Sequence, residues 1–371
     1  MQPRDSQRPF VRQWQEVWNC CMLLGVICIR ALSANTLLAE ELIWSKLPSL
    51  PDKEGFASMF AGVSGGALLV AGGANFPDKK PWEGGKKVWH DTVFVLEKPD
   101  GEWEIAGKLP HPLGYGVSVT WRDSVICVGG SDAELHHSKV FRIEWRKGKL
   151  AFRELPPLPR PLANMSGTLL KDTLYLAGGV EKPDSTRALK LFLALDLSAK
   201  QPVWQEHEPW PGPSRMLAVA AVKDDSFFLV SGADLSAGPD GKPARTYLKD
   251  GYRYTPGKGW RRIADLPRAA VAAPSPAPRL GAKHFLVVSG DDASQPSVAP
   301  TEHKGFPKGI LAYDLAMNTW SESGDTPAPL VTLPTAQWNG IWVFVSSEQR
   351  PGVRSPEVWS MRQQMVSSPV N

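Results

Sequence analysis

The stretch Ala67-Leu-Leu-Val-Ala-Gly-Gly73 is a short run of sheet-forming apolar residues that ends in a glycine doublet. Runs of this kind, without polar alternation, are typical of strands that are covered on both faces. Glycine at the end of such a strand lets the backbone turn where a Cβ atom would be in the way. The stretch therefore predicts a buried strand that ends in a crowded turn.

The same unit recurs six times along the chain. From Gly73 to Ser347, the second residue of the doublet advances in steps of 57, 49, 53, 58 and 57 residues. A period of about 50 residues is typical of kelch repeats, in which each repeat is one four-stranded blade. Six units predict an all-β, six-bladed kelch-type β-propeller. The doublets are Gly72-Gly73, Gly129-Gly130, Gly178-Gly179, Ser231-Gly232, Ser289-Gly290 and Ser346-Ser347.

The two ends of the chain are predicted to share one blade. The segment Ile43–Pro48, before the first repeat, matches the fourth strand of the repeat unit. The segment Glu357–Met361, after the last doublet, matches the third strand of the unit. Pairing of these strands removes the free edges that an open ring exposes. We therefore expect the N-terminal strand to close the last blade, residues 40–365 to form a single domain, and residues 366–371 to form a tail.

Residues 1–39 differ from the rest of the chain. Three arginines precede the apolar run Cys20–Ile29, and small residues follow it, which is typical of a secretory signal peptide. The run is shorter than the roughly 20 residues that a membrane-spanning helix needs. The sequence thus predicts a signal peptide in residues 1–39, a periplasmic or secreted protein, and no membrane span in the mature chain.

Charge and cysteine content narrow the classes of partner and cofactor. The net charge of +4 is small and dispersed along the chain, so no nucleic-acid partner is expected. Three of the four cysteines lie in the signal-like segment, and Cys127 sits in an apolar strand pattern that predicts a buried, inert thiol. His136-His137 is adjacent rather than spaced for one metal, and it is predicted to be a solvated loop. We expect no metal and no cofactor.

The candidate binding face is the one that carries the loops after the doublets. Three of these loops, at 74–90, 233–249 and 291–308, are long, and function usually resides where a rigid scaffold carries elaborated loops. In the sixth loop, Glu348 and Arg354 flank a Pro-Gly turn, so both can point inward over the ring centre. This pair suits an anionic sugar and a proton transfer, and the alternative is an ion pair that only stabilises the turn.

Two segments resemble a known family: 70–89, VAGGANFPDKKPWEGGKKVW, and 348–359, EQRPGVRSPEVW. They resemble cyclically permuted members of the N-acetylneuraminate epimerase family, the sialic acid mutarotases, and the resemblance covers nearly all of residues 43–361. It implies a mutarotase that interconverts the α and β anomers of sialic acid by proton transfer and ring opening, without a cofactor. A non-catalytic kelch propeller that binds a protein or glycan partner through the same face is the alternative.

The resemblance also implies roles for single residues. In the family motif G-E-x-x-P-G-x-R, the Glu is the proton acceptor and the Arg lies in the active site. Glu348 and Arg354 occupy these two positions, whereas Ser347 stands in place of the glycine. Lys86 and His303 are candidate acids or hydroxyl ligands, and Asn75 and Trp82 are candidate sugar contacts.

Overall fold

The structure is a computed structural model that describes residues 40–238 and 241–365. The predicted signal peptide and the tail 366–371 lie outside the described residues, so both stay predictions. Residues 42–363 form one compact unit. In the described part of the chain, no helix is both long and apolar enough to cross a bilayer.

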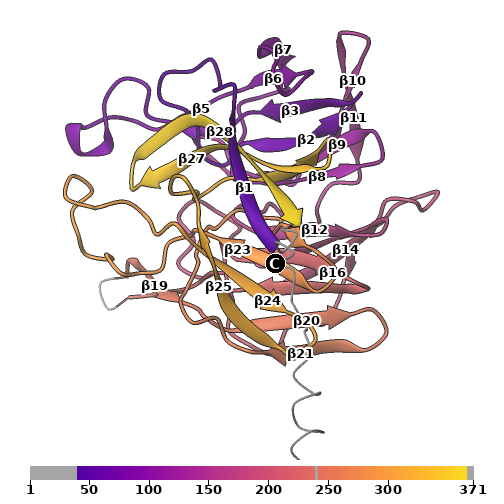
Figure 1. Ribbon diagram of the computed structural model, residues 1–371, viewed down its shortest axis with the longest axis vertical. Helices are drawn as coiled ribbons and strands as arrows, with labels where there is room; N and C mark the ends of the chain where they lie inside the picture. The colour runs from indigo at the N-terminus through magenta and orange to yellow at the C-terminus, as the bar shows by residue number, and fades with distance from the viewer. Residues whose placement is uncertain (1–39, 239–240, 366–371) are drawn as a thin grey trace, which may run out of the picture. The chain divides into compact units, whose positions relative to one another are not determined.

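The described chain forms six four-stranded antiparallel sheets, the blades of a propeller (Figure 1), together with two short two-stranded sheets. The predicted all-β, six-bladed propeller is confirmed. Blade 1 contains β2 (Phe60–Ser64), β3 (Ala67–Ala71), β6 (Thr92–Leu96) and β7 (Glu104–Lys108); blade 2 contains β8 (Val117–Trp121), β9 (Ser124–Val128), β10 (Val140–Arg146) and β11 (Lys149–Leu155); blade 3 contains β12 (Ser166–Leu170), β13 (Thr173–Ala177), β14 (Phe192–Asp196) and β15 (Gln205–Glu206); blade 4 contains β16 (Val219–Lys223), β17 (Ser226–Val230), β20 (Gly251–Thr255) and β21 (Gly259–Ile263); blade 5 contains β22 (Arg279–Leu280), β23 (His284–Val288), β24 (Gly309–Asp314) and β25 (Thr319–Asp325); blade 6 contains β26 (Thr335–Trp338), β27 (Ile341–Arg350), β28 (Val353–Met365) and β1 (Glu40–Leu47).

Blade 6 is completed by the N-terminal strand, as predicted. Its strand order is β1-β28-β27-β26, and Figure 1 shows the indigo β1 beside the yellow β28. The Ser360 hydroxyl donates to the Ser45 carbonyl at 3.1 Å, and Lys46 Nζ lies 2.6 Å from a Glu357 carboxylate oxygen. Strands from the two ends of the chain therefore close the ring.

The strand before each doublet is buried because neighbouring blades cover both of its faces. All five residues of β3, β9 and β17 are buried, and Cys127 of β9 is fully enclosed, which raises the pKa of its thiol. The predicted buried thiol is confirmed. Apolar packing between blades thus supplies the main stabilising term of the fold.

The first residue of each doublet adopts a left-handed backbone conformation, and the blades use it in two ways. In blades 1 to 3 it is glycine, and at Gly178 a Cβ atom would lie 2.1 Å from the Arg215 carbonyl oxygen of the link into blade 4. In blades 4 to 6 it is serine, whose hydroxyl accepts a hydrogen bond from a backbone N–H of the next blade. These bonds run from Ala270 to Ser231 at 2.7 Å, from Leu330 to Ser289 at 2.9 Å, and from Phe56 to Ser346 at 2.7 Å.

A Gly178→Ala variant tests this close approach. Gly178 has a φ of +69°, so alanine is strained there, and its methyl group also collides with backbone. Gly340 has a φ of +79°, and an added methyl group would meet no atom within 4 Å, so Gly340→Ala carries the backbone strain alone. We expect Gly178→Ala to lower the free energy of unfolding by about 2 kcal/mol more than Gly340→Ala does in urea denaturation. Equal losses would contradict the collision.

A closed ring of six backbone hydrogen bonds surrounds the propeller axis. Each blade contributes one residue that follows the link from the preceding blade, and all six residues have φ between +52° and +61°. Because each member bonds to its two neighbours, the ring fixes the order of the blades, with blade 3 opposite blade 6 and blade 4 opposite blade 1. The N–H donors and their carbonyl acceptors are Tyr115 to Ser58, Asn164 to Tyr115, Leu217 to Asn164, Ala272 to Leu217, Thr332 to Ala272 and Ser58 to Thr332, at 2.7–3.0 Å.

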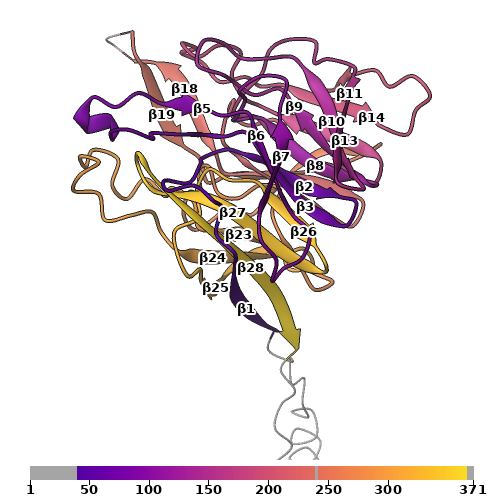
Figure 2. The same cartoon turned by 90° about the horizontal axis from the view of Figure 1, so that it is seen from above.

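Two of the predicted long loops contain paired strands. The first holds β4 (Ala74–Asn75), the 3-10 turn η1 (Pro81–Glu83) and β5 (Val88–Trp89), and the loop of blade 4 holds β18 (Ala233–Ala237) and β19 (Pro243–Tyr247). Figure 2 shows that β5, β18 and β19 extend to the same side of the blades. These hairpins form the walls of the cavity described below.

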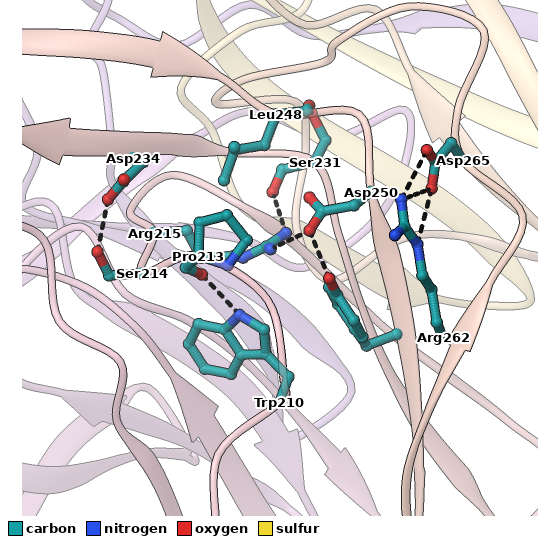
Figure 3. Close-up of polar contacts among 11 residues, drawn as sticks. Trp210, Pro213, Ser214, Arg215, Ser231, Asp234, Leu248, Asp250, Arg262 and Asp265 are labelled. Atoms are coloured by element: carbon teal, nitrogen blue, oxygen red, sulfur yellow. Dashed lines mark hydrogen bonds and ion pairs between the residues drawn. The ribbon is translucent and has the colours of Figure 1, made fainter.

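A buried arginine ties the link between blades 3 and 4 to blade 4 (Figure 3). Arg215 is fully buried, and its guanidinium donates to the Ser231 carbonyl and to Asp250 Oδ2, both at 2.9 Å. The same carboxylate oxygen accepts the Tyr252 hydroxyl at 2.7 Å, and burial beside it raises the pKa of Tyr252 to about 12. The Trp210 and Tyr252 rings lie 5.4 and 5.3 Å from the guanidinium.

Candidate active site

A cavity of about 920 Å³ lies on the face that carries the loops after the doublets. Loops of all six blades line it, and five members of the axial ring form its floor: Tyr115, Asn164, Leu217, Ala272 and Thr332. The sequence predicted this face as the binding face from loop length alone. The ring gives the floor a rigid backbone, because each of its N–H and C=O groups is already bonded.

Glu348 and Arg354 face each other across the β27–β28 hairpin, and both line the cavity. Arg354 Nη2 lies 3.4 Å from Glu348 Oε1, and the same oxygen accepts the Gly352 N–H at 2.8 Å. The Thr332 hydroxyl of the axial ring lies 3.4 Å from Oε2. The carboxylate is therefore positioned by the turn, by the arginine and by the cavity floor.

Arg354 keeps unused hydrogen-bond donors. Its side chain is only 4% exposed, yet its Nε and Nη1 atoms have no hydrogen-bond partner in the described part of the chain. The guanidinium lies 4.7 Å from the centre of the Phe76 ring, so one face is covered by an aromatic side chain. A buried donor without a partner costs about 1–3 kcal/mol, and an incoming anion that accepts a hydrogen bond from one of these groups relieves part of that cost.

Lys87 brings a second cation to the same wall. β4 and β5 pair Ala74 with Trp89 and Asn75 with Val88, and Phe76 and Lys87, which adjoin these strands, both line the cavity. The Lys87 ammonium lies 5.3 Å from the Trp89 ring and 5.0 Å from the Tyr115 ring. Among the described residues, no carboxylate lies within ion-pair distance of it. Lys87 thus remains available to an anionic ligand near Arg354.

The six predicted site residues divide into two groups. Glu348, Arg354 and His303 line the cavity. The remaining three do not appear in its lining: Asn75 is fully buried and contacts His90 at 2.8 Å, Trp82 of η1 lies 5.9 Å from the Arg350 guanidinium, and Lys86 is exposed. Their proposed roles as sugar contacts or acid gain no support from this placement.

Lys87 rather than Lys86 faces the cavity because side chains alternate along a strand. Trp89 and Lys87 are two residues apart and both line the cavity, whereas Lys86 and Val88 are exposed. The period of two is readable in the sequence. It points to Lys87 only once the segment is known to be a strand, and the sequence alone predicts a loop there.

A backbone hydrogen bond selects one tautomer of His303. Its side chain is buried, and its Nδ1 atom accepts a hydrogen bond from the Gly305 N–H at 3.0 Å. An Nδ1 that accepts carries no proton, so the proton of the neutral ring resides on Nε2. The Phe306 ring packs edge-on against the imidazole at 5.2 Å.

The other carboxylates of the cavity have protein partners. Asp132 Oδ2 lies 2.7 Å from His137 Nε2, and Asp291 Oδ2 accepts the Tyr247 hydroxyl at 2.8 Å. Burial and this contact raise the pKa of Tyr247 to about 12. In the described ranges, no three His, Cys, Asp or Glu side chains gather closely enough to hold a metal ion.

His136 corrects one sequence-based prediction. A solvated loop was expected, but His136 is buried on the cavity wall with Nδ1 3.1 Å from the Val180 carbonyl oxygen. The expectation was wrong because the loop after Gly130 turns back into the cavity and pairs Ser131 with His136. Burial lowers the pKa of His136.

Three histidines with lowered pKa values predict acid sensitivity. Burial lowers the pKa of His90, His111 and His136 below the ordinary value. The unfolded chain then binds more protons than the folded chain near pH 5–6. The folded state therefore keeps its full stability above the unfolded pKa of about 6.5, and it loses stability as the pH falls from there toward the lowered pKa values of the folded state. We expect a lower urea midpoint at pH 5 than at pH 7.5, and a smaller difference in His111→Gln. Equal midpoints for the wild type would contradict this.

Known proteins resemble this chain over a segment that contributes to the cavity wall. A sequence model described as N-acetylneuraminate epimerase matches residues 29–152, which include Phe76, Lys87 and Trp89 of the cavity wall. The N-acetylneuraminate epimerase of Yersinia enterocolitica serotype O:8 is 40% identical over 128 residues, 30% of this chain and 32% of the relative. That of Salmonella enteritidis PT4 is 42% identical over 110 residues, 26% of this chain and 28% of the relative. The chain thus matches about a third of the length of these curated relatives.

A solved structure supports the fold. The structure of YjhT superposes with a TM-score of 0.61 at 15% identity, and the match covers 86% of this chain and 99% of that one. At this identity the likeness concerns the fold alone. The predicted resemblance to the N-acetylneuraminate epimerases is confirmed by the sequence matches, within residues 29–152 for the family model.

Proposed function

We propose that this protein is a mutarotase that interconverts the α and β anomers of N-acetylneuraminate. The observation that carries the proposal is the buried Arg354, which offers two unpartnered N–H donors beside Glu348 at the wall of an open cavity. A guanidinium with free donors suits the forked binding of a carboxylate, and the adjacent acid suits proton transfer at a hydroxyl on the neighbouring carbon. The family resemblance supports the same assignment.

In the proposed mechanism Arg354 binds the C1 carboxylate of the sugar, and Lys87 adds a second positive charge. Glu348 accepts the proton of the anomeric hydroxyl while the bond from C2 to the ring oxygen breaks, and the ring oxygen takes up a proton. C2 becomes a ketone, and the carbonyl group turns about its bond to C3. The same oxygen then attacks the other face of C2 and gives back the proton that it took up. Glu348 then returns its proton to the new anomeric oxygen. Bond making and bond breaking balance without a redox step.

His303 is our candidate for the group that hydrogen-bonds to the ring oxygen during ring opening. Its Nδ1 accepts from the Gly305 N–H, so its Nε2–H can donate a hydrogen bond to the ring oxygen while that oxygen takes up a proton from solvent. The ring lies on the cavity wall and is shielded by Phe306. His303→Gln is therefore expected to slow the exchange of anomers.

Two further parts of the assignment are proposals from sequence. Residues 1–39 support export of the chain through a signal peptide. Residues 40–365 are proposed to form the functional domain, since their strands and loops include every cavity-lining residue named above.

The test is a direct measurement of anomer exchange. Crystalline sugar of one anomeric form is dissolved, and its anomeric proton signals are followed by time-resolved NMR with and without the purified protein. We expect faster equilibration with the protein than in buffer at the same pH. If the folded protein leaves the rate unchanged, the mutarotase assignment is wrong and a non-catalytic sugar-binding propeller takes its place.

A further inference from the structure

The cavity carries cations on a second wall, away from Arg354 and Lys87. Lys182 of the blade 3 loop and Arg245 of β19 both line the cavity. Among the described residues, no carboxylate lies within ion-pair distance of either side chain. The cavity acids are already engaged, since Asp132 contacts His137 and Asp291 contacts Tyr247.

The order of the blades places these two cations opposite the first pair. The closed hydrogen-bond ring runs through blades 1 to 6 in sequence, so blade 3 faces blade 6 and blade 4 faces blade 1 across the axis. Arg354 belongs to blade 6 and Lys87 to blade 1, whereas Lys182 belongs to blade 3 and Arg245 to blade 4. The cavity thus has positive charge on two facing arcs.

The hairpin β18–β19 orients its cation toward the cavity. Arg245 pairs with Leu235 in the register, and both residues line the cavity together with Tyr247, which is two positions further along β19. Arg245 lies close enough to Tyr247 to lower the pKa of its hydroxyl, although burial outweighs this effect. On the neighbouring blade, the turn at Lys182 is fixed by its N–H, which donates to the Ser185 hydroxyl at 3.0 Å.

The size of the cavity exceeds the need of one sugar ring. Sites for small molecules typically measure roughly 300–1,000 Å³, and the volume of about 920 Å³ lies near the upper end of that range. A single acidic sugar bound at Arg354 brings one carboxylate to one arc. The cations of the facing arc then remain without an anion.

We propose that the cavity holds a second anion subsite, formed by Lys182 and Arg245, and that it binds acidic saccharides with two carboxylates, such as a linked dimer of N-acetylneuraminate with a free reducing end. The reducing sugar occupies Arg354 and Glu348, and the carboxylate of the other sugar reaches the facing wall. This inference rests on the proposed function, because it extends the same site to a longer substrate of the same class.

The test compares two ligands in one titration experiment. The dissociation constants of N-acetylneuraminate and of its linked dimer are measured by calorimetry at fixed salt for the wild type and for the double variant Lys182→Ala/Arg245→Ala. A dimer whose non-reducing carboxylate has been reduced to an alcohol serves as the ligand control. Lys200→Ala, an exposed lysine that follows β14 in blade 3, serves as the matched protein control.

We expect the wild type to bind the dimer about three- to tenfold more tightly than the single sugar, the range for one or two exposed charge pairs. The double variant and the reduced dimer should lose this preference, and Lys200→Ala should keep it. Equal affinity of the wild type for both ligands would overturn the subsite. An equal loss for both ligands in the double variant would also overturn it, and would indicate a general electrostatic attraction. A failure of the proposed function is distinguished by the NMR experiment, in which the protein would then not accelerate the exchange of anomers.

Discussion

Glu348→Gln is expected to abolish most of the acceleration of anomer exchange while the protein still binds the sugar. The amide cannot accept the proton of the anomeric hydroxyl, and general base catalysis typically contributes about 10²- to 10⁴-fold in rate. Glutamine has nearly the same shape and can still accept the Gly352 N–H, which lies 2.8 Å from Oε1 in the wild type. The fall should therefore appear in kcat, measured by NMR exchange, and only weakly in the affinity measured by calorimetry.

Glu357→Gln is the matched control for this variant. Glu357 also lies on β28, but it forms a partly exposed ion pair with Lys46 outside the cavity lining. Its substitution should leave the exchange rate unchanged and cost at most about 1 kcal/mol of stability. If Glu348→Gln retains the wild-type rate, Glu348 serves as a turn-stabilising partner of Arg354, which is the alternative that spacing alone left open.

The repeat made the fold predictable, because the same physical demand recurs in every blade. In each blade an apolar strand covered on both faces ends in a left-handed turn. The small residues of the six doublets, from Gly72-Gly73 to Ser346-Ser347, mark these turns in the sequence. Closure by the N-terminal strand followed from counting strand types at the two ends. The axial ring was not predictable, since its members share only a backbone conformation and range from Ser58 to Leu217.

The site was predictable only in part, because side-chain direction in the long loops depends on local pairing. Glu348 and Arg354 flank a turn, and they pair across the hairpin although its register shifts between Glu348 and Arg350. Asn75 is polar and close to the cavity loops in sequence, yet its side chain is buried against His90 and Asp52. Tyr247 and Asp291 come from different blades, so no local pattern joins them.

Asp250→Ala is expected to be among the most destabilising single substitutions in the chain. It removes the carboxylate that accepts a hydrogen bond from Arg215, whose side chain is 0% exposed, and it leaves that charge uncompensated (Figure 3). Removal of one partner of a buried ion pair typically costs about 3–5 kcal/mol. The Tyr252 hydroxyl also loses its acceptor. We expect a loss of that size in the free energy of unfolding measured in urea.

Two further variants separate the buried charge from a general effect of substitution. Asp250→Asn keeps an oxygen acceptor, so it should cost less than Asp250→Ala and provide a folded protein if alanine prevents folding. Asp265→Ala removes the partner of Arg262 in an ion pair whose side chains are 60% and 50% exposed, drawn in the same view, and it should cost less than about 1 kcal/mol. Similar losses for Asp250→Ala and Asp265→Ala would contradict the account, because they would show that burial of Arg215 adds nothing to the cost of losing its partner. The backbone of Arg215 is joined to blade 3, because its carbonyl accepts the Gly179 N–H at 2.9 Å. A large difference would therefore establish that the link between blades 3 and 4 depends on the buried pair of Arg215 and Asp250.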